Sequence, residues 1–557
     1  MPSGATATLR HQLALAFACG LGAIAYAPPA GAFGGFYVSG GNAQLANSAT
    51  SVVLMREGLR TVLSMETNYQ GPPEQFALVV PVPVVLQKES VKTLKPEVFR
   101  KIDQLSAPRL VEYWEQDPCQ PHTDEGAARN RVPRAPSPAP GGRADDLGVK
   151  VEAQFSVGEY DVVILSANEA AGLEVWLRQN KYNVPTGSAP YLKPYVALGS
   201  KFFVAKIDPK KLRFEARQAR LSPLRFHYDS DELQLPVRLG LINSAGTQDL
   251  LVHILARGQR YEVANYPNVT TPTNLDLEPQ AREQFDQLYA RLFDLLLEKR
   301  PGAVVTEYAW DAGSCDPCTQ PPLTPAELAS LGADVLPGSP SSEATANRPG
   351  GPPRPWFAGR ASGFVLTRLH TRYSKTSLGE DLVFRAAPPI SGGREVRSGP
   401  EGALEQSSKP DSINNFQARY AIRYPWTGPV ACKEPRRGVW GGPPASAPVE
   451  QRERGKGLPQ AAADLGYLKR QPIDLAALVK QPVPEIGPLP TSSPQAASNN
   501  DSTPSSRVGC TGCHATPSPA APFGSALAAM AALWLARAKR KTTPRRGEPR
   551  DCPETPG

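Results

Sequence analysis

The residues best suited to chemistry in the body of this chain are four cysteines: Cys119, Cys315, Cys318 and Cys432. In an exported protein an even set of cysteines indicates disulfides, and four cysteines allow three pairings, which the sequence leaves open. Cys315 and Cys318 have the spacing of a redox pair, or of half a zinc site completed by Cys119 or Cys432. However, the Thr-Gln-Pro-Pro that follows Cys318 does not open the helix that would stabilise a thiolate. We favour structural disulfides, and keep a thiol–disulfide oxidoreductase as the alternative.

Other catalytic patterns are missing from the sequence. Outside the two ends the histidines are isolated along the chain and form no zinc-hydrolase motif: His122, His227, His253 and His370. There is no Gly-x-Ser-x-Gly elbow and no phosphate-binding glycine loop. The acidic turn at 227–232 could offer oxygen ligands to Ca²⁺, but a solvated turn explains it more simply. The sequence therefore predicts no cofactor and no resident metal, and favours a non-catalytic role.

Both the charge and the N-terminal segment bear on where the protein works. Half of the net charge of +8 lies at 537–557, which hold seven Lys or Arg and three Asp or Glu, so charge implies no nucleic-acid partner. Near the N-terminus, Arg10 precedes an apolar run at 13–27, and Ala30-Gly31-Ala32 supplies the small residues of a cleavage site. We therefore predict a signal peptide at 1–32 and export of the chain.

The C-terminal region combines a paired-cysteine motif with a short apolar segment. Cys510 and Cys513 lie in Gly-Cys-Thr-Gly-Cys-His, and the apolar run 523–536 is followed by a cluster of Lys and Arg. As a helix this run would reach only about 21 Å, against a hydrocarbon core of about 30 Å, which suits a transient stop better than a permanent anchor. The motif also fits c-type haem attachment, an alternative that its Pro- and Ser-rich surroundings disfavour.

This tail resembles the myxobacterial C-terminal sorting signal over residues 509–546. The resemblance implies that a membrane-embedded sorting protease removes the tail, and that a modified Cys510 or Cys513 anchors the protein. The chain departs from the pattern by continuing past the basic cluster, through a disordered tail at 547–557.

Between the two ends of the chain, the sequence pattern predicts strands and helices in succession. Two strands at 51–65 flank Arg56-Glu57-Gly58 as a hairpin, and Pro81 and Pro83 predict a sheet edge within 76–86. Pro96 opens a helix that Pro108 restarts through Trp114, and the apolar stripe of 279–300 predicts another helix. Further strands are expected near 363–371 and 414–424.

Several short motifs resemble the bacterial exported family called domain of unknown function 2330. They are Gly34–Val38, the Phe76–Pro83 run, Gly158–Val162, Trp176-Leu177 with Tyr182, and Leu233–Leu239. Together they cover most of 33–330. The resemblance implies export but no activity, so it supplies no catalytic residues.

The sequence thus predicts an α+β protein with antiparallel or mixed sheets, packed helices and two subdomains. The predicted segments are an N-terminal subdomain (33–135), a second subdomain (149–330), a strand region packing on the body (356–440), a disordered Pro-rich stalk (441–508) and the sorting signal (509–546) with its apolar helix (523–536). We expect a cell-surface or outer-membrane-associated protein whose partners are the membrane, reached through the tail or a lipid, and a sorting protease.

Overall fold

The computed structural model describes residues 36–37, 49–66, 77–119, 149–180, 182, 187–215, 218–243, 246–337, 363–395, 397–398, 403–443, 460–461 and 473–489. All of them belong to the compact unit Met1–Pro494. The predicted signal peptide, the paired-cysteine motif at 510–513 and the apolar run 523–536 lie outside the described residues.

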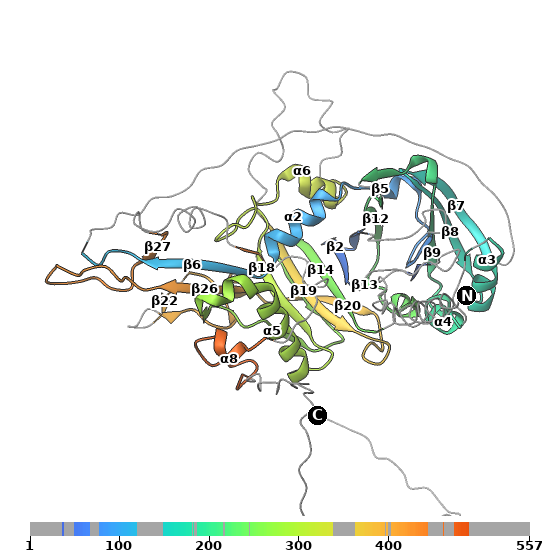
Figure 1. The fold of residues 1–557 in the computed structure, drawn as a ribbon. Helices are drawn as coiled ribbons and strands as arrows, with labels where there is room; N and C mark the ends of the chain where they lie inside the picture. The colour runs from blue at the N-terminus through green and yellow to red at the C-terminus, as the bar shows by residue number, and fades with distance from the viewer. Residues whose placement is uncertain are drawn as a thin grey trace, which may run out of the picture. The chain divides into compact units, whose positions relative to one another are not determined.

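The predicted hairpin is present, and it lies inside the largest sheet (Figure 1). Strand β2 (Ala49–Glu57) pairs antiparallel with β3 (Arg60–Met65) around Gly58, whose φ of +57° glycine adopts freely. The other strands of this sheet are β5 (Val91–Thr93), β12 (Leu224–Asp229), β14 (Gln248–Arg257), β16 (Asn268–Thr270), β18 (Val304–Asp311), β19 (Phe364–Tyr373), β21 (Ile390–Gly392), β24 (Lys409–Pro410) and β25 (Asn415–Gln417). Within the described ranges the sheet has eleven strands, in the order β24-β21-β25-β18-β19-β14-β2-β3-β12-β5, with β16 beside β18.

A second sheet packs face to face on the largest one. In order, its strands are β1 (Phe36–Tyr37), β4 (Ala77–Val82), β9 (Lys201–Ile207), β8 (Tyr160–Ala167) and β7 (Val149–Val157). The core between the sheets includes Leu54 and Leu63 on one side and Val162 and Phe203 on the other. Strand β1 pairs only with Leu78 and Val79, so at Pro81 the β1 side of β4 is an open edge, as predicted, while Pro81 still pairs with Phe202 of β9.

Helices cover the outer faces of both sheets. On the second sheet lie α3 (Ala170–Gln179) and α4 (Ala189–Ala197). On the largest sheet lie α2 (Glu97–Ser106), α6 (Pro325–Leu328) and α5 (Phe285–Lys299). The predicted stripe of α5 is buried, with Leu288 and Leu292 fully covered, which confirms this helix. The layers are therefore helix, sheet, sheet, helix.

A further sheet corrects the predicted helix beyond Pro108. Residues 109–115 form β6 (Arg109–Glu115), which pairs parallel with β26 (Arg419–Tyr424). The other members of this sheet are β17 (Leu275–Leu277), β27 (Trp440–Gly441) and β28 (Gln460–Ala461). The helix prediction was wrong here because Val, Tyr and Trp suit a strand once a partner is present, and that partner comes from the far end of the body.

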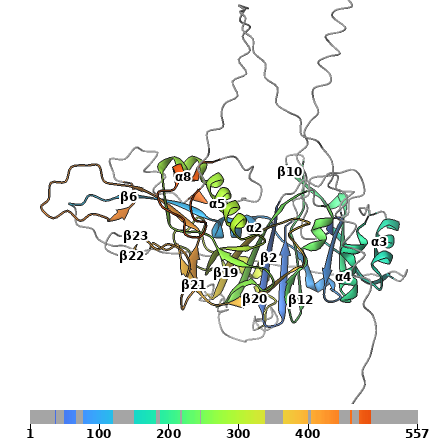
Figure 2. The ribbon, with the colours of Figure 1, turned by 90° about the horizontal axis from the view of Figure 1, so that it is seen from below.

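Part of the predicted stalk is folded. Residues 473–489 include α8 (Leu475–Leu478), which lies against α5 (Figure 2). Leu475 and Val483 are fully buried. For this stretch the prediction of a disordered stalk was wrong, because its apolar residues lie between prolines and reach the same core as α5. Because the composition of this stretch is rich in Pro, its apolar residues did not indicate a folded segment.

The described residues also form three smaller sheets. They are β13 (Leu233–Leu235), β20 (Leu382–Ala387) and β15 (Arg260–Val263); β10 (Arg213–Glu215) with β11 (Gln218–Arg220); and β22 (Arg397–Ser398) with β23 (Ala403–Leu404). The mixed sheets with packed helices agree with the α+β class. The predicted segments 33–135, 149–330 and 356–440 all contribute strands to the largest sheet, so they share a core.

Candidate functional site

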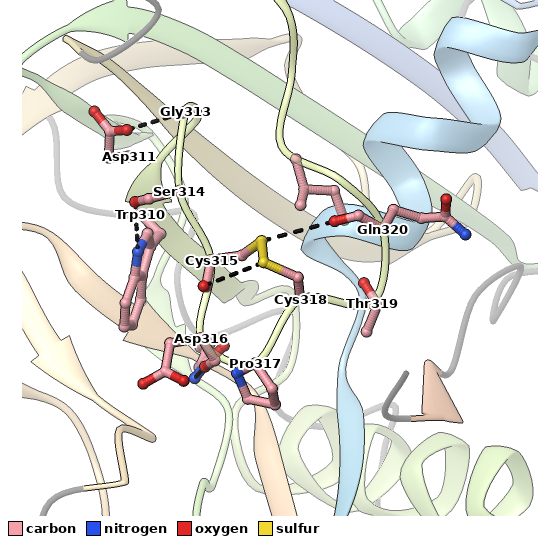
Figure 3. Close-up of a disulfide and its surroundings, with 12 residues drawn as sticks. Trp310, Asp311, Gly313, Ser314, Cys315, Asp316, Pro317, Cys318, Thr319 and Gln320 are labelled. Carbon is pink, nitrogen blue, oxygen red and sulfur yellow. Dashed lines mark hydrogen bonds between the residues drawn. A yellow bond between two sulfur atoms is a disulfide. The ribbon is translucent and has the colours of Figure 1, made fainter. Parts of the chain in front are cut away.

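The Cys315-x-x-Cys318 motif forms a disulfide-closed loop after β18 (Figure 3). The two Cα atoms are 4.9 Å apart, and both cysteines are partly buried. Nη1 of Arg109 donates a hydrogen bond to the Pro317 carbonyl (2.8 Å). The Thr319 hydroxyl donates to the carbonyl of Gln104 in α2 (2.5 Å). The loop is thus fixed to α2 and to the start of β6.

The surroundings of this disulfide favour a structural role. Among the described residues, the next helix after the pair, α6, begins only at Pro325, so the pair does not lie at the start of that helix, where a thiolate would be stabilised. The carbonyl oxygens of Gln320 and Cys315 lie 3.7 and 3.2 Å from the sulfurs of Cys315 and Cys318. In the reduced form these oxygens would accept hydrogen bonds from the thiols. Since an acceptor stabilises the thiol and not the thiolate, the geometry works against a reactive nucleophile.

The other two cysteines join distant parts of the chain. Cys119 follows β6, and Cys432 lies in the loop between β26 and β27, with Cα atoms 5.5 Å apart. The amide of Cys119 donates to Asp117 Oδ1 (2.9 Å), and the amide of Arg436 donates to the Pro118 carbonyl (2.9 Å). This disulfide therefore holds the 425–439 loop to the end of β6.

A buried ionic cluster lies between the largest sheet and its helices. The register of β18 against β19 shifts between Thr306 and Tyr308, and this bulge places Glu307 among buried charged groups. The carboxylate of Glu307 is fully buried and accepts from Arg368 Nε (2.6 Å), from His370 Nδ1 (2.8 Å) and from the Tyr289 hydroxyl (2.8 Å). The cluster thus joins β18, β19 and α5.

Two more carboxylates extend this cluster. Arg368 also pairs with Asp103 of α2, and Nε2 of His370 lies 3.0 Å from Asp249 Oδ1 of β14. Asp249 in turn pairs with Arg372. The imidazole of His370 stacks on Phe293 of α5 with ring centroids 3.9 Å apart. Each ring nitrogen of His370 therefore faces a carboxylate.

Electrostatics favour the charged forms of Glu307 and His370. Burial alone would raise the pKa of Glu307, but the charges of His370 and Arg368 outweigh burial and lower this pKa to about 2. Burial would lower the pKa of His370, but Glu307 and Asp249 outweigh burial and raise it. His253, also buried on β14, has its pKa lowered to about 3 by burial and by Arg368. The cluster can therefore stabilise the fold. Its charged groups pair with one another, which suits a structural role better than catalysis.

The sequence missed this cluster because its members are isolated along the chain. One available signal was the alternation of β19, which puts Arg368 and His370 on the same face as Phe364 and Leu366. Among the described side chains, no three His, Cys, Asp or Glu are grouped so as to hold a metal ion. In the acidic turn Asp229 pairs with Arg60 (2.6 Å), as an ordinary surface turn would.

The predicted anchoring motif cannot be placed in the fold, and the described helices are not membrane spans. Cys510, Cys513 and His122 lie outside the described residues. No described helix combines the length and the hydropathy that crossing a bilayer requires.

No curated protein and no solved structure matches the chain. Residues 28–385 match a family described as "Uncharacterized protein conserved in bacteria", domain of unknown function 2330. This match covers more than half of the chain and includes every motif on which the resemblance rested. The chain belongs to this family of uncharacterized bacterial proteins.

Proposed function

We propose that this protein is exported and displayed on the surface of a bacterial cell, where its folded body has a binding or envelope role without catalysis. The observation that carries the proposal is the pairing of all four body cysteines, Cys119 with Cys432 and Cys315 with Cys318. Disulfides persist in oxidising compartments and are rare in the bacterial cytoplasm. The predicted signal peptide at 1–32 supports the same location.

Anchoring is assigned to the C-terminal motif. Its resemblance to a sorting signal supports removal of the tail by a sorting protease and attachment through a modified Cys510 or Cys513. A lipid at either cysteine would hold the body at the outer membrane. The partners of this step are the membrane and the protease.

The test is intact mass spectrometry of native protein, combined with protease treatment of whole cells. We expect a mature chain that begins at Phe33, lacks Trp534, contains two disulfides and is digested on intact cells. The control is a Cys510→Ser, Cys513→Ser double variant, which should keep the body's disulfides but lose the anchor. Native protein that retains Trp534 and carries free thiols at 510 and 513 would contradict anchoring. Complete protection on intact cells would contradict display.

The second candidate is an exported thiol–disulfide oxidoreductase at Cys315 and Cys318. It is favoured by the spacing of the pair and by the cationic Arg109, which contacts the carbonyl of Pro317 in the same loop. A dithiol titration distinguishes the two functions. Ready reduction, together with exchange activity that Cys315→Ser abolishes, would favour the enzyme. Resistance to reduction in the folded protein supports the structural role.

A further inference from the structure

One short segment carries most of the positive charge of the body. Of the net charge of +8, residues 537–557 account for four, with seven Lys or Arg against three Asp or Glu, and Arg10 accounts for one. The remaining chain therefore has a net charge of +3. Residues 206–220 contain six Lys or Arg and two Asp or Glu, so this stretch alone has a charge of +4. The rest of the body is slightly negative, and its positive charge is concentrated in the basic segment 206–220.

The basic segment runs from the end of β9 into a hairpin. Lys206 lies near the end of β9, the 3-10 turn η3 (Pro209–Lys211) supplies two more lysines, and the hairpin of β10 and β11 follows (Figure 2). Arg213 and Arg220 are register partners across this hairpin. Like charges directly opposite one another destabilise a strand pair, so stability of the hairpin does not explain two arginines at these positions.

The lysines of the basic segment are accessible. Lys206, Lys210 and Lys211 are all exposed. Lys211 pairs with Asp208 (3.1 Å) and lies 3.8 Å from Asp161 of β8. With the one further carboxylate of the segment, three acidic groups oppose six basic groups, which leaves an excess of three positive charges. The segment is therefore an exposed surface with more positive charge than its own ion pairs neutralise.

Such a surface attracts an extended anionic partner. Groups of four to eight Lys or Arg in a short segment are typical of proteins that bind anionic lipid headgroups. The proposed anchor brings a membrane within reach, because Cys510 follows the last described residue, Leu489, by 21 residues. The choice of a membrane as the partner rests on the proposed anchoring, whereas the excess of positive charge does not.

We propose that the basic segment 206–220 is a docking surface for the anionic headgroups of a lipid membrane. The contact is electrostatic and exposed, so it weakens as the salt concentration rises. A single anchor at 510 or 513 leaves the orientation of the folded body open. A second contact through the basic segment fixes which face of the body is turned away from the membrane.

The first test maps the contact in the full-length protein. Lysines are briefly acetylated in the presence of vesicles of phosphatidylcholine, or of phosphatidylcholine mixed with phosphatidylglycerol, and each modified lysine is quantified by mass spectrometry. Lys210 should become several-fold less reactive with the anionic vesicles only. Lys375, which is exposed in the turn between β19 and β20, is the internal control and should not change. Equal reactivity of Lys210 with both kinds of vesicle would overturn the proposal.

The second test removes three charges from the segment and compares co-sedimentation with the anionic vesicles. The segment variant combines Lys206→Gln, Lys210→Gln and Lys211→Gln. The control variant loses the same charge at three exposed lysines elsewhere, through Lys95→Gln, Lys299→Gln and Lys375→Gln. The segment variant should bind at least about tenfold more weakly than wild type, and the control variant should bind like wild type. Equal weakening in both variants would show an effect of net charge alone and would refute a docking surface.

The outcomes also separate this contact from the anchoring. The tail 509–546 is the same in all three proteins, so a segment variant that binds as tightly as wild type would assign binding to the tail and refute the docking surface. Binding of wild type to the soluble polyanion alginate but not to vesicles would point to an anionic glycan and would equally refute a lipid partner. Vesicle binding through the segment needs no processing of the tail, so a failure of the anchoring proposal leaves these results unchanged.

Discussion

Glu307→Gln tests the ionic cluster at the β18 bulge with almost no change in shape. The substitution removes the charge that faces Arg368 and His370, both of which are buried. Breaking a buried ion pair by removing one partner costs about 3–5 kcal/mol, since the remaining charge stays desolvated. The urea m-value of small proteins reaches about 3 kcal/mol/M and grows with size, so with an m-value of roughly 4 kcal/mol/M the unfolding midpoint should fall by about 1 M.

The assay is equilibrium urea unfolding at neutral pH, followed by circular dichroism, and m should not change. Arg385→Met is the matched control, because Arg385 pairs with Glu262 at the surface and should lose at most about 1 kcal/mol. Arg368→Met should destabilise the protein as Glu307→Gln does, and the double variant should lose less than the sum of both. A loss for Glu307→Gln no larger than that for the control would refute a stabilising cluster.

The remaining predictions concern pH, a disulfide and a glycine. The pKa of His370 in the folded protein is raised above 6.5, so its contribution to the free energy of unfolding is complete below pH 6.5 and is lost as pH rises through the folded pKa. His370→Gln should therefore flatten the alkaline side of a plot of the free energy of unfolding against pH. Cys119→Ser with Cys432→Ser should lower the free energy of unfolding by up to about 5 kcal/mol, and an unchanged urea midpoint would contradict this. Gly332→Ala should cost about 1–3 kcal/mol, because φ is +136° and a Cβ would lie 2.7 Å from Val62. Gly58→Ala, which meets no atom within 4 Å, should cost less in the same assay.

Local patterns were enough to predict the hairpin at 51–65 and the helix that became α5. In each case the signal lies within one segment: a turn with a glycine, or leucines three and four residues apart. Residues 109–115 show the limit of such reasoning. Leu110, Val111 and Trp114 have a spacing that a helix could use, but β26 offers them a partner strand from more than half the chain away. Pairing across that distance is not visible in the segment itself.

The candidate sites depend even more on distant pairing. The groups of the ionic cluster meet because β14, β18 and β19, which are far apart in the sequence, are neighbours in the largest sheet. Helix α2 then brings Asp103 to Arg368. The bulge that turns Glu307 inward has no glycine or proline to mark it. The four cysteines were predictable as candidates from composition alone, whereas their pairing required the sheet that carries β6 and β26.

The folded unit extends beyond the family match. That match ends at residue 385, but β25 and β26 come later and complete two sheets, with β25 beside β18 and β26 beside β6. Tyr420 of β26 and Leu475 of α8 are fully buried against α5. If the chain ended at residue 385, the apolar stripe of α5 would face water. Cys119 would also lack its disulfide partner, Cys432. The described residues of 403–443 and 473–489 are therefore part of the core that supports the ionic cluster.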